Sequence, residues 1–186
     1  MAVSTNTALT TWKLDPAHTA VEFAVKHMMF TTVRGRFKGV DGTINVDEQN
    51  PNASHVEVEI DAASIDTAVG DRDAHLRSAD FLDAQTHPKI TFRSTRVEGA
   101  HRKEGDRFKV TGILTIRGTS QEVTLECSFE GLGKDPWGGQ RAGFNARTEI
   151  DRREWGLKWN QALETGGILV GNSVKIEIEA QAVKQT

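Results

Sequence analysis

The stretch "RFKVTGILTIRGTSQEVTLECSFEG" (residues 107–131) alternates apolar and polar side chains on both sides of a short turn. Successive side chains of a β-strand point to opposite faces of its sheet, so this period of two predicts two strands, each with one apolar face. The turn "RGTS" (117–120) is short enough to make the strands antiparallel neighbours. The stretch therefore predicts a β-hairpin with one face in contact with a core.

The same alternation recurs along most of the chain. Segments that carry it include "AVEFAVKH" (20–27), "SHVEVEID" (54–61), "PKITFRST" (88–95), "RAGFNARTEI" (141–150) and "NSVKIEIEAQA" (172–182). Turn residues separate them, so the pattern predicts eight or nine short antiparallel strands. Such strands form a sandwich or a closed barrel, and alternation alone does not separate the two. Small inward residues such as Gly112, Ala142 and Ala146 are a weak indication of a barrel, because a barrel of about eight strands can enclose one small ligand.

The bulk properties of the chain restrict its function. Its 186 residues suffice for one domain, which we place at residues 12–186 after a flexible tail at 1–11. The 23 basic and 26 acidic residues are interspersed, which argues against nucleic-acid binding because such proteins carry a clustered basic face. The single cysteine cannot form an internal disulfide. The N-terminal residues lack the basic and apolar regions of a secretory signal, so we expect a cytoplasmic protein.

One segment, "VGDRDAHLRSADFLDAQTHP" (69–88), interrupts the alternation. It predicts a short helical insertion around 71–82, with Asp71 as the N-cap and Asp73 in the first turn. On such a helix Asp71 and His75 would be neighbours, as would Asp73 and Arg77. Leu76 and the apolar residues after it give the insertion an apolar underside, so we expect it to cover one end of a barrel.

The histidines and acids of this segment could also suggest a metal site or an acid–base pair. A metal site needs three or four converging ligands at fixed spacing, and no HExxH, H-x-E or CxxC pattern links His18, His27 and His87. It has no G-x-S-x-G nucleophile motif either. Cys127 alternates with apolar neighbours, which is typical of a buried, unreactive thiol. We therefore predict no catalytic residue, no metal and no cofactor.

Three other features leave alternatives open. His27 ends an apolar face, so it is either a polar contact in a cavity or a histidine satisfied in the core. "VRGRFKG" (33–39) places three cations on one face, where they could meet an anionic head group or a membrane; pairing with Glu57 and Glu59 is the favoured interpretation. In "DRREWGLKW" (151–159) the two tryptophans either pack over a barrel end or form an aromatic rim around its mouth.

Four longer blocks carry a resemblance to a known family. They are "LDPAHTAVEFAVKHMMFTTVRGRFKGVDGTI" (14–44), "DAASIDTAVGDRDAHLRSADFLDAQTHPKITFRST" (61–95), "GILTIRGTSQEVTL" (112–125) and "IDRREWGL" (150–157). Together they resemble the successive motifs of the YceI-like family, in the family's order, over nearly the whole chain from Trp12 to about Val183. Four ordered blocks are more specific than any single short motif.

The resemblance implies an all-β fold, an extended eight-stranded antiparallel, lipocalin-like barrel with the short helical insertion beside it. It also implies a lipid-binding protein, not an enzyme, that holds a long-chain isoprenoid or a related amphiphile such as a polyprenyl phosphate, a quinone or a fatty acid. An enzyme that acts on such a lipid inside the barrel is the alternative. A transient membrane contact and a homodimer are further candidate interactions. Many members of the family are exported to the periplasm, and residues 1–11 depart from that pattern.

The expected binding residues are the inward apolar positions, with His27, Arg72 and Arg152 as head-group candidates. The complete predicted set is Val21, Phe23, Val25, His27, Phe37, Val58, Ile60, Arg72, Phe92, Leu114, Phe144, Arg152 and Trp155.

Overall fold

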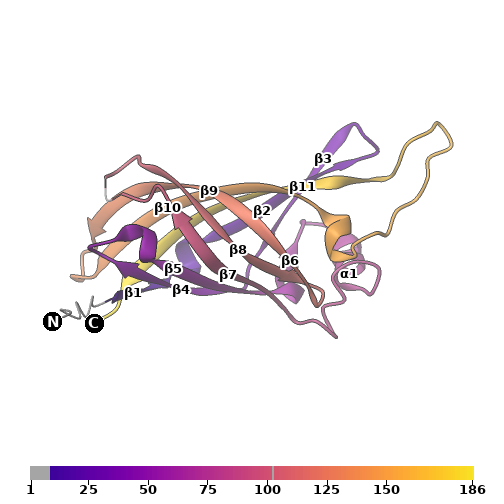
Figure 1. Cartoon of the computed structure of the whole chain (residues 1–186). Helices are drawn as coiled ribbons and strands as arrows, with labels where there is room; N and C mark the ends of the chain where they lie inside the picture. Colours follow the sequence, from indigo (N-terminus) through magenta and orange to yellow (C-terminus); the bar gives the residue numbers. More distant parts are fainter. Residues whose placement is uncertain (1–8, 102) are drawn as a thin grey trace.

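The computed structural model describes residues 9–101 and 103–186, which form eleven strands, one α-helix and four short 3-10 helices (Figure 1). The strands are β1 (Leu9–Leu14), β2 (Ala20–His27), β3 (Thr31–Phe37), β4 (Val40–Asp47), β5 (His55–Asp61), β6 (Ile65–Asp66), β7 (Lys89–Glu98), β8 (Arg107–Ile116), β9 (Thr119–Lys134), β10 (Gln140–Asp151) and β11 (Val170–Lys184). The helices are η1 (Pro16–His18), η2 (Pro51–Ala53), η3 (Ala62–Ser64), α1 (Gly70–Arg77) and η4 (Arg152–Trp155).

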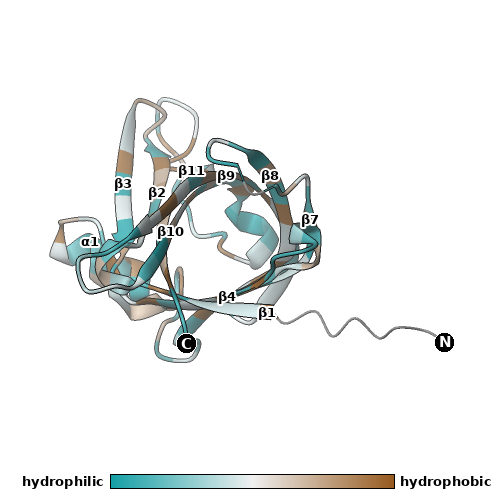
Figure 2. Ribbon diagram, turned by 90° about the vertical axis from the view of Figure 1, so that its left-hand side faces the viewer, coloured by the Kyte–Doolittle hydropathy of each residue, from teal (hydrophilic) through white to brown (hydrophobic). Residues whose placement is uncertain are grey.

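All strands belong to one antiparallel sheet that closes on itself. The order runs β1-β4-β5-β7-β8-β9-β10-β11, and β1 then pairs with β11. Three of these eight strands are bent and continue beyond the bend: β1 as β2, β4 as β3 and β5 as β6. The continuing halves remain in the sheet, because β2 pairs with β11 and β3, and β3 pairs with β6. The molecule is therefore a closed eight-stranded barrel, and Figure 2 shows the ring of strands along its axis. A sandwich is excluded.

The hairpin predicted from residues 107–131 is present as β8 and β9, with Ile116 opposite Thr119. Its turn places Arg117 and Gly118 at φ +50° and +73°, the left-handed pair that a two-residue hairpin turn requires. The inward side chains of the barrel gather in two clusters. One surrounds Trp155 toward the end where α1 lies, and the other surrounds Trp12 toward the termini.

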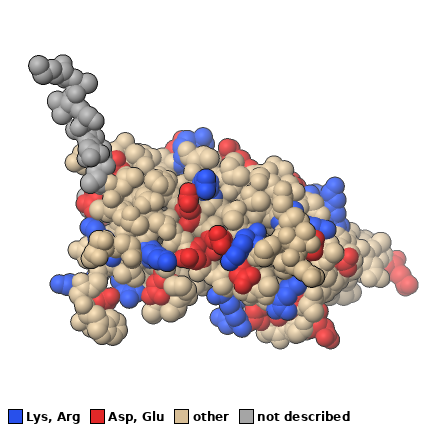
Figure 3. Space-filling view, turned by 90° about the horizontal axis from the view of Figure 1, so that it is seen from below, with Lys and Arg blue, Asp and Glu red and all other residues tan. Residues whose placement is uncertain are grey.

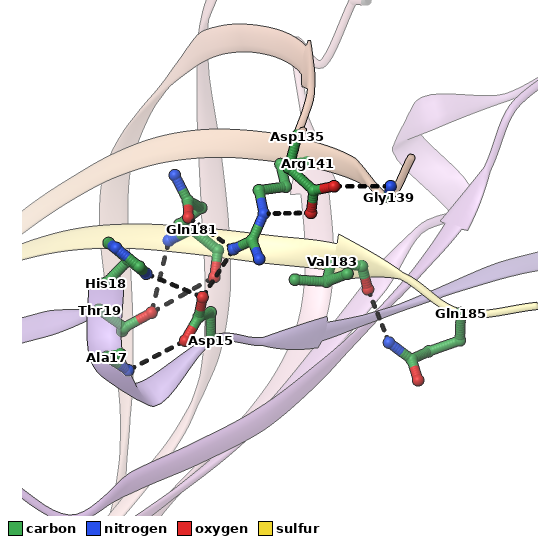
Figure 4. Close-up of polar contacts among 10 residues, drawn as sticks. All are labelled: Asp15, Ala17, His18, Thr19, Asp135, Gly139, Arg141, Gln181, Val183 and Gln185. Atoms are coloured by element: carbon green, nitrogen blue, oxygen red, sulfur yellow. Dashed lines mark hydrogen bonds and ion pairs between the residues drawn. The ribbon is translucent and has the colours of Figure 1, made fainter. Parts of the chain in front are cut away.

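An ionic clasp holds the bend between β1 and β2 (Figure 4). Asp15 caps η1 by accepting from the Ala17 amide at 3.0 Å, and its other oxygen lies 2.6 Å from Arg141 Nη1 on β10. Arg141 Nε also donates to Asp135 at 2.9 Å, in the turn between β9 and β10. The side-chain bond from Arg141 lowers the pKa of Asp15 to about 2, with His18 contributing next. The clasp joins the bend after β1 to the start of β10 and to the turn between β9 and β10.

Helix α1 lies at the end of the barrel opposite the termini (Figure 1). The prediction of an Asp71 N-cap is wrong, because the helix begins at Gly70 and no side chain caps it. Asp73 is buried and accepts from the Thr67 amide at 2.8 Å and the Thr67 hydroxyl at 2.6 Å. Asp73 therefore fixes Thr67, in the segment that leads into the helix, instead of capping the helix.

The two predicted helix pairs are also replaced by other contacts. His75 Nε2 lies 2.8 Å from Asp80 Oδ2, beyond the helix. Arg77 donates to the carbonyl oxygens of Ala63 at 2.8 Å and Ile65 at 3.1 Å. His75 therefore ties α1 to the turn that follows it, and Arg77 ties it to the segment of η3 and β6 that precedes it.

On the outside of the barrel, charges of both signs are interspersed, as the face in Figure 3 shows. Lys38 and Arg36 pair with Asp66, at 2.7 and 4.0 Å. The predicted partners Glu57 and Glu59 are wrong, since these glutamates pair with basic residues of β7, Arg93 and Lys89. The reason is the order of the strands in the sheet, because β3 pairs with β6, whereas β5 pairs with β7.

The N-terminal boundary also differs from the prediction. Residues 9–11, assigned to the flexible tail, pair with β4 as part of β1. Residues 1–8 lie outside the described part of the chain.

Candidate ligand cavity

A cavity of about 550 Å³ occupies the interior of the barrel. Every strand of the barrel contributes inward side chains to its wall, and most of them are aliphatic or aromatic. The lining extends from Trp12 and Val46 near the termini to Leu76 and Phe81 beside α1. The volume lies within the range of roughly 300–1,000 Å³ that small-molecule sites occupy. The inward faces thus enclose a long apolar lumen.

Most of the predicted binding residues lie on this lumen. The ones that line it are Val21, Phe23, Val25, His27, Phe37, Val58, Ile60, Arg72, Phe92, Leu114, Phe144 and Arg152. Trp155 does not line it: the side chain is 1% exposed, and Nε1 donates to the Leu114 carbonyl at 2.9 Å. That indole packs in the core, which agrees with the packing alternative for this tryptophan. Contact of the other twelve with a ligand stays a prediction.

Three separate segments line the α1 end of the lumen, which is called the mouth below. The hairpin of β2 and β3 contributes His27 and Val33, and α1 contributes His75. The segment before β11 contributes Trp159 and Leu169. The His75 ring meets the Trp159 ring edge-on, with 4.6 Å between the ring centroids. An aromatic and imidazole rim therefore borders this mouth, as expected for Trp159 in the rim alternative.

Arg152 places a buried positive charge on the wall near this mouth. The residue is 3% exposed, and its guanidinium donates to the carbonyl oxygens of Gly171, Leu157 and Val170. No carboxylate lies within 4.0 Å of it among the described residues. Burial lowers the pKa of Arg152 from its ordinary value, although an arginine stays charged in proteins. Three carbonyl oxygens and the charge of nearby Asp151 stabilise this buried cation on the wall of the lumen.

Arg72 is held beside the lumen by Thr67. Its Nε donates to the Thr67 hydroxyl at 2.7 Å and its Nη2 to the Thr67 carbonyl at 3.0 Å. The same hydroxyl donates to Asp73. A buried carboxylate thus orients a threonine that in turn orients an arginine at the cavity wall, so the helix positions this cation through its first turn.

The opposite end of the lumen carries polar residues that the sequence pattern did not single out. Glu48, His55 and His101 line the cavity there, together with Trp12. They come from strand ends and loops, where alternation fades, so period-two reasoning had no signal for them. The indole of Trp12 is 7% exposed and could have been found as the first inward residue of its strand.

Comparison with known proteins identifies the family of the chain. A family model described as the YceI-like domain matches residues 12–182. The protein YceI of Escherichia coli O157:H7 is 45% identical over 149 residues, which cover 79% of this chain and 76% of that protein. The chain belongs to the YceI-like family. Protein YceI of Salmonella newport is 44% identical over 148 residues, 78% of this chain and 75% of that one.

Solved structures share the YceI-like fold. BcnA of Burkholderia cenocepacia superposes with a TM-score of 0.77 at 24% identity, over 90% of this chain and 98% of that one. The YceI protein of Campylobacter jejuni gives 0.72 at 27% identity, over 87% and 90%. A polyisoprenoid binding domain from Saccharophagus degradans gives 0.71 at 14% identity, over 94% and 98%. The first and third show likeness of fold alone.

The chemistry available in this YceI-like barrel is sparse. Burial raises the pKa of Cys127 to about 12, so its thiol stays protonated at neutral pH. Within residues 9–101 and 103–186 no three His, Cys, Asp or Glu side chains converge on a point that a metal ion could occupy. The same part of the chain has no helix with the length and apolar character of a membrane span. The lumen offers shape, apolar surface and a few cations.

Proposed function

We propose that this protein binds a long-chain isoprenoid or a related amphiphilic lipid, carried or stored in the lumen of its barrel. The observation that supports this most is the apolar cavity, whose lining reaches from the Trp12 end to the α1 end. Membership of the YceI-like family and the fold shared with a polyisoprenoid binding domain point the same way. Both also indicate a binding protein more than an enzyme.

The energetics of an apolar tail agree with such a ligand. Burial of one methylene contributes about 0.8 kcal/mol, so one five-carbon isoprene unit contributes roughly 4 kcal/mol before costs. Eight units would sum to roughly 30 kcal/mol, above the ceiling of about 18–21 kcal/mol for non-covalent complexes, so ordering of the chain must cancel much of the gain. A tail of several units therefore suffices for tight binding, and the lipid should survive purification.

The head group belongs, in this proposal, at the α1 end. Arg152 and Arg72 supply positive charge there, and neither has a carboxylate within 4.0 Å among the described residues. A phosphate or a quinone oxygen can accept from guanidinium N–H groups. The tail would then extend toward Trp12 between the inward faces of the strands.

The test is organic extraction of protein made in a bacterial host, followed by mass spectrometry. Ala146 lines the lumen, so Ala146→Phe should fill part of it and lower the lipid recovered per protein at least severalfold. Arg147 is its exposed neighbour on the outer face, and Arg147→Phe serves as the matched control that should keep its lipid. Absence of lipid from the wild-type protein at any stoichiometry would contradict the proposal, as would equal recovery from a folded Ala146→Phe.

A further inference from the structure

The turn between β2 and β3 exposes three consecutive apolar side chains. Met28 is 41% exposed, Met29 64% and Phe30 81%. The other large exposed apolar residues of the described chain, Leu9, Val69, Leu132 and Trp137, each occur singly. Isolated exposed apolar residues are common on soluble proteins, whereas a contiguous run marks an interaction surface. Met28–Phe30 is called the apolar tip below.

The backbone of the apolar tip adopts a conformation that is unfavourable for methionine. Met28 and Met29 adopt φ +50° and +64°, and the Phe30 amide donates to the His27 carbonyl at 3.1 Å. His27 pairs with Thr31, so the connection has three residues, and its first two adopt the left-handed conformation, which a Cβ disfavours and which Asn and Gly adopt more readily. Two methionines in these positions weaken the turn. Such local cost at an exposed site points to a role that needs the apolar side chains themselves.

The apolar tip stands beside the mouth of the lumen. His27, directly before the tip, and Val33, three residues after it, line the cavity. The Met28 amide donates to the Leu169 carbonyl at 2.8 Å, which ties the tip to the segment between η4 and β11. Figure 1 shows the β2–β3 hairpin and this segment both extending beyond the α1 end of the barrel. A surface that contacted the tip would therefore face the mouth.

Two exposed basic residues lie behind the apolar tip: Lys26, which also borders the cavity, and Arg34 on β3. Lys26 and Arg34 have no carboxylate within 4.0 Å among the described residues. Charges farther along the outer face are mixed: Glu22, Glu149, Lys175 and Glu177. Apolar side chains at the extremity with cations behind them match the layers of an anionic bilayer, where acyl chains lie beneath phosphate groups.

We propose that the apolar tip inserts into the interface of an anionic lipid bilayer, with Lys26 and Arg34 against the phosphate groups, so that the α1 mouth faces the membrane. This rests on the proposed lipid-binding function and adds where the lipid enters and leaves. The bilayer is preferred to a protein partner because the tip has the dimensions of a single turn, whereas a stable protein interface buries about 800 Å² on each side.

Vesicle flotation tests the proposal with wild-type protein and phosphatidylcholine vesicles that contain or lack phosphatidylglycerol. Met29→Ser/Phe30→Ser should weaken binding to the anionic vesicles at least about tenfold, because the groups that enter the interface are gone. Met28→Asn/Met29→Gly should weaken binding while keeping the hairpin, which separates loss of the apolar groups from loss of folding. Arg34→Gln should reduce the preference for anionic vesicles severalfold.

The matched control is Trp137→Ser, which removes an 86% exposed aromatic side chain from the turn between β9 and β10 at the opposite end. It should bind vesicles like the wild type. Equal losses in Trp137→Ser and the tip variants would overturn the proposal, as would a wild-type protein that retains extractable lipid but does not float. A wild-type dimer that the tip variants convert to monomer, without a change in flotation, would assign the tip to a second copy of the chain.

Lipid extraction from the same variants keeps the two proposals apart. None of the three tip residues lines the cavity, so the tip variants should still contain lipid after purification. Lipid absent from every protein, with flotation intact, would contradict the lipid-binding function and leave the membrane contact standing.

Discussion

Two glycines of the barrel make room for aromatic rings that face the lumen. A Cβ on Gly35 would lie 2.4 Å from Cζ of Phe23, and a Cβ on Gly112 would lie 2.6 Å from Cζ of Phe92. Neither distance is sterically allowed, so each ring rests on bare backbone across the strand pair. At the scale of the residue, the lumen exists because small residues lie next to large ones on the inward faces.

The turn residues Met28 and Met29 yield a stability prediction. Met28→Asn/Met29→Gly should raise the free energy of unfolding by about 1–2 kcal/mol, because Asn and Gly adopt positive φ at lower cost. Urea denaturation monitored by tryptophan fluorescence measures it. Met28→Leu/Met29→Leu is the control, and it should leave stability nearly unchanged. A loss of stability in the Asn-Gly variant would show that the methionine side chains support the fold.

The two aspartates at the start of α1 should differ sharply. Asp73→Ala removes the acceptor of two Thr67 hydrogen bonds and should lower the free energy of unfolding by about 1–3 kcal/mol. Asp71 is exposed and makes no cap, so Asp71→Ala should cost only about 0.5 kcal/mol or less. Urea titration of both variants measures the difference. Equal effects would contradict the assignment of the anchoring role to Asp73.

At the scale of the element, three strands of the barrel bend and continue. The breaks fall at η1, at Lys38–Gly39 and at η3, so β1 with β2, β3 with β4, and β5 with β6 each act as one strand. Each bend lets one half follow a different neighbour in the ring. Polar side chains stabilise the breaks: Asp15 caps η1 and Asp61 caps η3, each by accepting from an amide two residues ahead.

The clasp of Asp15 and Arg141 should make the barrel acid-sensitive over a defined range. The folded-state pKa of Asp15, about 2, lies below its ordinary value of 3.8. The carboxylate therefore stabilises the fold fully above about pH 4, and this contribution is lost as the pH falls toward 2. Asp15→Asn should lower the free energy of unfolding at pH 7 by about 1 kcal/mol, allowing for partial solvent screening.

Urea titrations of the wild type and Asp15→Asn at several pH values measure this contribution. The difference between them should be constant above about pH 4 and should shrink toward pH 2. A difference that stays the same down to pH 2 would mean that the charge of Asp15 does not support the bend.

At the scale of the whole molecule, the barrel surrounds a cavity instead of a solid core. The inward side chains form two buried clusters, one with Trp155 and one with Trp12, and the cavity is lined by residues of both. The mouth at α1 combines a hairpin, a helix and a loop that are distant in sequence. The closure of the sheet into a barrel therefore decides where the lumen, its mouth and its cations lie.

On the proposed function, removal of the lipid should destabilise the whole barrel. A ligand that binds only the folded state raises the free energy of unfolding by about 2.7 kcal/mol when its free concentration is about 100 times Kd. Delipidated protein should melt at a lower temperature in differential scanning calorimetry, and addition of an isoprenoid alcohol or quinone should restore the midpoint. A midpoint that does not change with delipidation or addition would indicate that the lumen needs no guest to be stable.

The sequence by itself determined the strands, the face of each that points inward and the helical insertion, because periods of two and the turn residues between them act locally. Closure of the sheet came from the family resemblance, since alternation is the same in a sandwich. Only the tertiary structure decided that Trp155 fills the core, that Asp73 holds Thr67, and that Glu57 pairs with Arg93. Each of these contacts joins two residues whose separation in space depends on strand register and on the bends. The local periodicity of the sequence predicts neither.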